Sequence, residues 1–220
     1  MPMAIAGVVL AASALVLMVG VEWLKRPRLE ILPTSWRASL PVPWVFAAVK
    51  IRNRPLWRPL QAVLVRNSAL GCEVTLEIRV PGQTQLAIPE IAARWSGQPE
   101  PIRSVPMPAP VSPGGSGQSR VIMVAQYDPT MLPQTLRFDV PSTQDGQEIA
   151  IAVLRDDGTA HAWGAESYAF PGWKNPVWEL DRQVYEVTVR AQASGISKSR
   201  RFRLDNLAPD FARFSRVEPA

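Results

Sequence analysis

The side chains that most often carry catalysis are scarce in this chain, which contains one histidine, His161, and one cysteine, Cys72. Alternating apolar residues around Cys72 predict that its thiol faces a core, on a different strand from His161. A cysteine nucleophile with a histidine base is therefore not expected, and these two residues cannot complete a structural zinc site. The Gly-rich run at 114–117 lacks the lysine and the following helix that a phosphate site needs. We expect no catalytic residue, no cofactor and no bound metal.

Paired carboxylates can act without histidine, and two pairs have to be weighed. Glu73 and Glu77 occupy the polar side of a predicted strand, about 14 Å apart at ~3.4 Å per residue, which is too far for glycoside chemistry. Asp156 and Asp157 are neighbours in a predicted turn and offer too few oxygen ligands for calcium. We interpret both pairs as solvated charge. A hydrolase whose carboxylates meet only in the fold is the lesser alternative.

Aromatic side chains are the candidates for a binding site. The chain has eight tryptophans, and four aromatic residues gather in one short stretch: Trp163, Phe170, Trp173 and Trp178. Aromatic side chains beside a proline-rich loop could line a groove for a peptide or a sugar. The competing interpretation is that they fill the core and pin loops.

An apolar stretch at residues 3–24 organises the rest of the chain. Its twenty-two residues would form a helix of about 33 Å, enough to cross a hydrocarbon core, and Glu22 is its only ionisable residue. A cleaved signal peptide would have a charged start and a shorter apolar centre. We predict a single transmembrane helix, with residues 1–28 as anchor and basic flank.

The basic flank predicts the orientation of the chain. Lys25, Arg26 and Arg28 directly follow the apolar stretch, and such residues favour the cytoplasmic side. We therefore expect a cytoplasmic body, with a body outside as the alternative. Basic residues near the membrane would also be attracted to an anionic leaflet. The competing interpretation is a topogenic signal plus solvated strand faces, and nucleic acid is not an expected partner.

The remaining elements predict an all-β body. Residues 29–44 are expected to form an extended stalk rich in proline and tryptophan, residues 45–206 the body, and residues 207–220 a tail with one helical turn. Period-two alternation predicts strands at 45–53, 72–80 and 183–191, the last pairing with 200–204 as a hairpin. A second hairpin is expected at the Asp-Asp-Gly turn of 156–158. Residues 99–118, rich in proline and glycine, are expected to form an exposed loop.

The segment around Asp181, Tyr185 and Val187 resembles the sixth strand of an immunoglobulin-like sandwich, in which Asp-x-x-x-Tyr-x-Cys forms a tyrosine corner. Valine stands in the cysteine position, and the resemblance implies Cys72 as the opposite partner, left reduced. The order of anchor, VKIRNRP, RNSALGCEVTLEI, ARWSGQPEP and YEVTVRAQASGISKSRRFRLDN is similar to a family of uncharacterised prokaryotic membrane-anchored proteins with a β-sandwich body. This resemblance implies fold and location, and no catalytic residue.

The expected protein is an antiparallel immunoglobulin-like β-sandwich behind one N-terminal transmembrane helix. With one cysteine it forms no internal disulfide, which fits a reducing compartment. Its expected role is non-catalytic: a membrane-tethered module that presents a binding surface to a protein partner near the bilayer. The alternative is an outward-facing domain that binds carbohydrate or cell-surface material through the aromatic residues.

Overall fold

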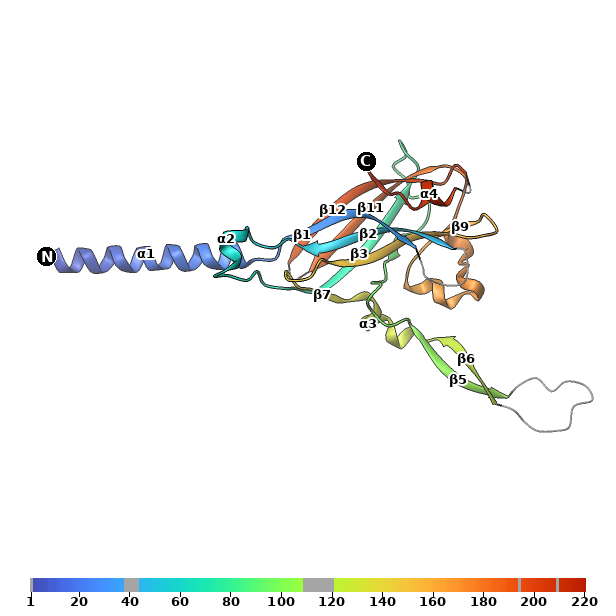
Figure 1. Ribbon diagram of the computed structural model, residues 1–220, viewed down its shortest axis with the longest axis horizontal. Helices are drawn as coiled ribbons and strands as arrows, with labels where there is room; N and C mark the ends of the chain where they lie inside the picture. Colours follow the sequence, from blue (N-terminus) through green and yellow to red (C-terminus); the bar gives the residue numbers. More distant parts are fainter. Residues whose placement is uncertain (1, 38–43, 109–120, 194, 209) are drawn as a thin grey trace, which may run out of the picture.

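The chain has three parts that are separate in space (Figure 1). Helix α1 (Pro2–Lys25) extends from one end of a β-rich body, and a two-stranded hairpin projects away from that body and from α1. The computed structural model describes residues 2–37, 44–108, 121–193, 195–208 and 210–220, with side chains from residue 12 onward except 35–37. Where side chains are described, no helix is long and apolar enough to cross a membrane.

Two antiparallel sheets form the body. The first has the strand order β1, β2, β8, β9 and β10, with bounds Leu29–Arg37, Val45–Asn53, Gln147–Leu154, Ala160–Ala162 and Glu179–Leu180. The second has the order β13, β12, β11, β3 and β4, and β7 also pairs with β3. Their bounds are Glu218–Pro219, Ile196–Asp205, Val184–Ala193, Ala69–Arg79, Ile91–Ala92 and Phe138–Val140. The projecting hairpin pairs β5 (Ile102–Pro108) with β6 (Val121–Tyr127).

Short helical segments connect the strands. The α-helical ones are α2 (Arg58–Gln61), α3 (Leu132–Leu136) and α4 (Phe211–Phe214). Single 3-10 turns lie at Pro129–Met131, Ala165–Ala169, Pro171–Trp173 and Pro176–Trp178. The turns Ala165–Ala169 and Pro171–Trp173 contribute Tyr168 and Trp173 to a cluster on the outer side of the first sheet, whereas Trp178 of the third turn is buried in the main core.

The main core lies between the two sheets, because each sheet contributes an apolar face. On β3 the predicted alternation is present, with Cys72, Val74, Leu76 and Ile78 buried and the intervening residues at least partly exposed. Large buried side chains come from both sheets: Ile31, Ile51, Ile149, Leu154, Leu76, Ile78, Tyr185 and Phe202. The body is therefore a sandwich-like pair of antiparallel sheets, as predicted at that level.

Both predicted hairpins are confirmed. Strands β11 and β12 pair along their whole length, from Val184 opposite Asp205 to Ala193 opposite Ile196. Strands β8 and β9 flank the Asp-Asp-Gly turn, and Gly158 there has a φ of 78°, which glycine adopts without steric cost. The helical turn expected in the tail is α4.

The predicted stalk at 29–44 is wrong for its first nine residues. Residues 29–37 form β1, which pairs with β2 from Leu29 opposite Asn53 to Arg37 opposite Val45. Proline argued against a strand, but β1 is at the edge of its sheet, where a missing N–H is tolerated. Leu29 and Ile31 are buried in the core. Trp44 precedes β2, and residues 38–43 lie outside the described residues.

Two other predicted boundaries also change. The exposed loop expected at 99–118 contains β5, because both strands of an isolated hairpin are edges and accept Pro106 and Pro108; residues 109–118 lie outside the described residues. The expected tail belongs to the body. Phe214 and Val217 are buried, and β13 pairs with β12.

The resemblance implied that Cys72 and Val187 face each other across the sandwich, and this is wrong. Strands β3 and β11 are neighbours in one sheet, where Val187 lies opposite Ile78. The tyrosine corner is present in its local form, since the Tyr185 hydroxyl donates a hydrogen bond to the Asp181 carbonyl oxygen at 3.4 Å. The hydroxyl also accepts a hydrogen bond from Gln183 Nε2 at 3.1 Å.

Candidate functional site

The structure divides the four candidate aromatic residues between two packing environments. Trp178 is buried in the main core, whereas Trp163 is buried in a smaller cluster on the outer side of the first sheet. Trp173 is half-buried there, with its ring centroid 5.6 Å from that of Trp163. Phe170 is half-buried in the connecting segment. The structure therefore brings Trp163 and Trp173 together and places Trp178 elsewhere.

The outer cluster is a packed aromatic layer. Trp163 makes edge contacts with Phe46 at 5.1 Å and Tyr168 at 5.6 Å, and Trp173 makes an edge contact with Trp44 at 5.3 Å. These geometries favour aromatic pairs in protein interiors. The sequence analysis missed Phe46 and Tyr168. The signal for Phe46 was the unbroken apolar run at the start of β2, which is typical of a strand covered on both faces.

Buried cationic and neutral groups lie beside this layer. The guanidinium carbon of Arg155 is 4.4 Å from the ring centroid of Trp44. The Nε and Nη2 atoms of Arg155 have no hydrogen-bond partner among the described residues. Burial, followed by the charge of Arg155, lowers the pKa of the His161 imidazole. Lys174 and Thr159 hold the pKa of the Asp157 carboxyl well below its usual range. A buried neutral histidine beside a buried arginine packs the layer and offers no activated nucleophile.

The residues at the end of α1 form a fixed junction with the body. Lys25 pairs with Glu22 at 3.4 Å, and the guanidinium carbon of Arg28 lies 4.8 Å from the ring centroid of Trp23. The Arg28 backbone N–H donates to Asn53 Oδ1 at 2.9 Å. Asn53 Nδ2 in turn donates to the Asn67 carbonyl oxygen at 2.7 Å. The basic flank thus leads directly into the body through side-chain and backbone hydrogen bonds.

Cys72 is buried, and burial raises the pKa of its thiol to about 12. The thiol therefore stays protonated and unreactive in the folded chain. Among the described residues, no group of three or more His, Cys, Asp or Glu side chains could hold a metal ion.

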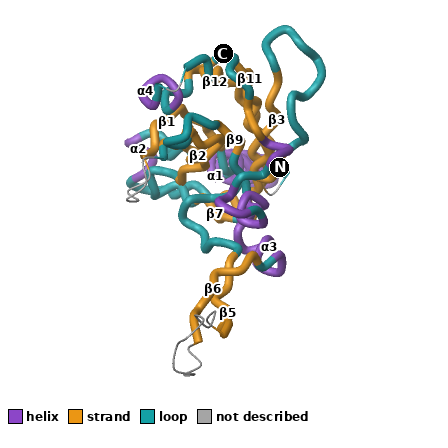
Figure 2. Tube along the Cα trace, turned by 90° about the vertical axis from the view of Figure 1, so that its right-hand side faces the viewer, coloured by secondary structure: helices purple, strands orange, loops and turns teal. Residues whose placement is uncertain are grey.

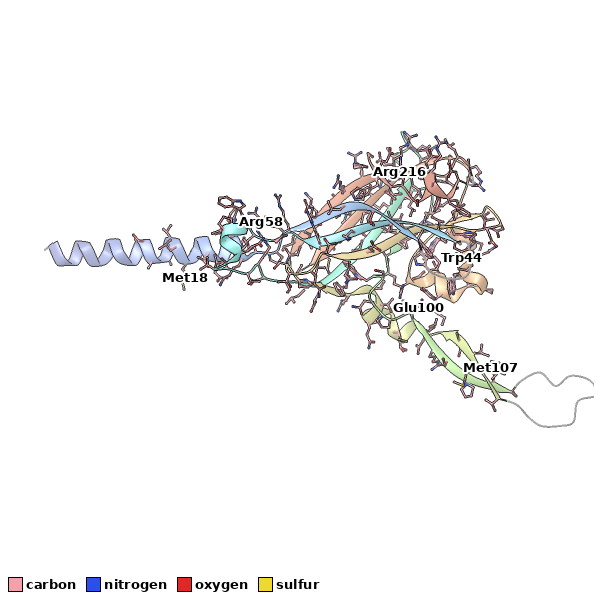
Figure 3. The ribbon with its side chains drawn as sticks, in the orientation of Figure 1. Met18, Trp44, Arg58, Glu100, Met107 and Arg216 are labelled. Atoms are coloured by element: carbon pink, nitrogen blue, oxygen red, sulfur yellow. The ribbon has the colours of Figure 1, made fainter. Side chains whose placement is uncertain are left out.

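The hairpin of β5 and β6 exposes several large apolar side chains: Met107, Val121, Ile122 and Met123. Figure 2 shows it extending away from the sheets. Its base is fixed: Ile102 and Tyr127 pack on the aromatic layer, and the Asp128 backbone N–H donates to the Pro101 carbonyl oxygen at 2.8 Å. The Tyr168 hydroxyl donates to Glu100 Oε1 at 3.1 Å, next to that base. Figure 3 shows Glu100 where the hairpin leaves the body and Met107 far out along it.

The outer half of the hairpin is apolar on both faces. Cross-strand pairs place Val121 opposite Pro108 and Met123 opposite Pro106 on one face, and Ile122 opposite Met107 on the other. The exposed fractions are 65% for Val121 and 62% for Met123. Exposed apolar side chains grouped in this way mark an interaction site.

The two outer edges of the hairpin differ in chemistry. Strand β5 carries Arg103, Pro106 and Pro108, which block strand addition at an edge. Strand β6, with the sequence VIMVAQY, has neither proline nor charge, and in the described residues it pairs only with β5. About half of its backbone N–H and C=O groups therefore face away from β5 and are free to pair with an added strand. The sequence analysis did not identify this strand as a site, because side-chain patterns do not show which strand remains unpaired.

No family model, curated protein or solved structure matches this chain.

Proposed function

We propose that this chain is a non-catalytic, membrane-tethered β-sandwich module that presents the β5–β6 hairpin to a protein partner. The body is proposed to be immunoglobulin-like, to lie on the cytoplasmic side, and to be anchored by α1 as a single transmembrane helix. The observation that carries the proposal is the free, uncharged β6 edge flanked by exposed apolar side chains.

The anchor is supported by what α1 would otherwise expose to water. Side chains from Leu15 to Val19 are all more than half exposed, and the helix extends away from the body (Figure 1). Covering such side chains with lipid recovers about 1.5–3 kcal/mol for each large one. The basic flank that follows supports the cytoplasmic orientation.

The hairpin is supported as the docking element by its chemistry and by its isolation. A two-stranded hairpin is marginally stable alone in water, and three or more strands stabilise it. A partner that adds an extended strand to β6 would supply backbone hydrogen bonds and cover Val121 and Met123. Because these side chains are about two-thirds exposed, full burial would contribute about 1–2 kcal/mol each. The partner we expect is therefore a protein with an extended apolar segment.

The immunoglobulin-like character is supported by the local tyrosine corner at Tyr185 and by the antiparallel sandwich. The adjacency of β3 and β11 in one sheet differs from the expected pairing of the second and sixth strands across two sheets. The resemblance is therefore proposed at the level of architecture.

Site-specific photo-crosslinking of the full chain in membranes of its source cells tests the docking role. A photoreactive amino acid at Met123 is expected to give a discrete protein adduct. The same amino acid at Val177, which is similarly exposed at 58% but lies on the body, is the matched control. Val121→Lys adds an exposed charge beside the β6 edge and should reduce the adduct at position 123.

The outcomes separate the docking role from general stickiness. A protein adduct at 123 that is absent at 177 and reduced by Val121→Lys supports the proposal. Equal yields at both positions, no adduct, or adducts with lipid alone would overturn it. Reporters fused at Ala220, one active only in the cytoplasm and one only outside, test the orientation, and activity outside would reverse it.

A further inference from the structure

Residues 54–66, here called the collar, return to the end of α1. The Arg54 backbone N–H donates to the Arg28 carbonyl oxygen at 2.8 Å, and the Asn67 N–H, just after the collar, donates to the Lys25 carbonyl oxygen at 2.8 Å. Figure 1 shows α2, which is part of the collar, beside the end of α1. The collar is therefore held at the level where an anchored chain would leave the bilayer.

The collar exposes apolar side chains at this level. The exposed fractions are 75% for Trp57, 79% for Val63 and 63% for Val65. Arg58, labelled in Figure 3, is exposed among them, as is Arg54. Tryptophan and arginine side chains next to aliphatic ones are typical of a segment at the membrane interface.

A cavity of about 490 Å³ opens beside these side chains. Its walls are mixed, with apolar Pro55, Leu56, Leu64 and Val65 on one part and polar or charged residues on the rest: Arg52, Gln61, Arg66, Ser142, Thr143, Gln144 and Asp145. The Arg66 side chain is 6% exposed, and its Nη1 donates to the Arg26 carbonyl oxygen at 2.5 Å. Its Nε has no partner among the described residues.

Arg66 is a buried cation without a neighbouring anion of its own. Burial, then the charges of Arg28 and Arg54, lowers its pKa. The carboxylates nearby are already paired, Glu30 with Arg52 at 2.8 Å and Asp145 with Lys50 at 2.9 Å. A buried charge is normally paired, and among the described residues Arg66 forms no ion pair, so the cavity is lined by a buried cation without a carboxylate partner.

We propose that the collar is a second membrane contact, in which the cavity takes the phosphate of an anionic phospholipid headgroup at Arg66. Trp57, Val63 and Val65 then insert beside it into the interface of the same leaflet. This proposal rests on the proposed membrane anchor. A phospholipid fits better than free phosphate because the apolar walls at Leu56 and Leu64 match the upper part of an acyl chain, and because the site is continuous with α1.

Depth-dependent quenching of the full chain in lipid nanodiscs tests this contact. Single cysteines replace Val63 in the collar, Val16 in α1 or Val177 on the body, and each carries a fluorophore, while buried Cys72 stays unlabelled. The discs contain phosphatidylcholine with increasing phosphatidylglycerol, plus a lipid with a quencher near its headgroup or deep in its acyl chain. The headgroup quencher is expected to act on position 63 more strongly as phosphatidylglycerol increases, and to leave position 177 unaffected.

Charge variants test the role of the arginines. Arg66→Gln removes the buried cation but also its hydrogen bond to the backbone, so Arg58→Gln, at an exposed position, serves as the variant that preserves the fold. The Arg58→Gln variant should weaken the preference for phosphatidylglycerol about fivefold, which corresponds to about 1 kcal/mol for one basic residue near an anionic surface. Arg201→Gln, an exposed arginine on β12, is the matched control and should leave the preference unchanged.

The outcomes distinguish the collar contact from the membrane anchor. Quenching at position 63 that rises with phosphatidylglycerol and falls in Arg58→Gln supports the collar contact. Deep quenching at position 16 together with no quenching at 63, or with quenching that ignores lipid charge, overturns the collar contact and leaves the anchor standing. Absence of deep quenching at position 16 overturns the anchor, and the collar contact with it.

Discussion

Trp95 links three parts of the body through one indole ring. The ring is fully buried, and its Nε1 donates to the carbonyl oxygens of Cys72 at 3.1 Å and Leu136 at 3.0 Å. Its centroid lies 5.3 Å from that of Phe138. The Trp95 backbone also bridges to Ile149, on the other sheet. The substitution Trp95→Phe keeps an aromatic ring and removes the donor.

The expected cost of Trp95→Phe combines two losses. Leaving buried acceptors unpaired costs about 1–3 kcal/mol. The smaller ring leaves unfilled space, which adds about 1–2 kcal/mol. We expect the free energy of unfolding to fall by about 2–5 kcal/mol. Urea titration of the full chain in detergent micelles, followed by far-ultraviolet circular dichroism, measures this change.

Val177→Ala is the control, because Val177 is 58% exposed on the body and outside the proposed membrane contact. Exposed substitutions usually change stability by less than about 0.5 kcal/mol. If Trp95→Phe lowers stability by no more than this control, the indole does not hold the segments together as the hydrogen bonds indicate.

Three further predictions follow from burial and backbone geometry. Burial and the charge of Arg155 lower the pKa of the His161 imidazole, so on acidification the unfolded chain takes up a proton more readily than the folded chain, and stability is lost. The urea concentration at the unfolding midpoint should be lower at about pH 5.5 than at about pH 7.5, and this difference should be smaller in His161→Gln. Because the pKa of Cys72 is raised to about 12, alkylation measured by mass spectrometry should be slow until denaturant is added, and rapid labelling of the native chain would contradict this burial. Gly146 has a φ of 95°, and an added Cβ would lie 2.5 Å from the Ile51 carbonyl oxygen; Gly146→Ala should therefore cost about 1–3 kcal/mol in a urea titration, more than Gly172→Ala, where the added Cβ meets no atom within 4 Å.

The sequence predicted strands correctly where one face of the strand is exposed to solvent. Alternation located β3 and the β11–β12 hairpin, because polar residues at every second position distinguish a half-buried strand from other structures. It did not predict β1 and β5 as strands, because proline was taken as evidence against a strand, which holds for central strands and not for edge strands. Whether a strand is an edge depends on pairing between distant segments, which no local pattern encodes.

The candidate site was predictable only in part. Clustering of Trp163 and Trp173 could be inferred from their spacing, but whether aromatic residues face a groove or another layer depends on what covers them. The β5–β6 hairpin and the collar are sites because of what they leave unpaired. Neither the free β6 edge nor the uncompensated charge of Arg66 has a signature in the residues next to it.

The hydrogen bonds around Asn53 give the junction with α1 a mechanical consequence. A helix joined to the body by a linker without hydrogen bonds could change its direction freely relative to the body. Here Asn53 contacts both Arg28 and Asn67, on either side of the joint. These hydrogen bonds therefore restrain the direction in which α1 leaves the sandwich.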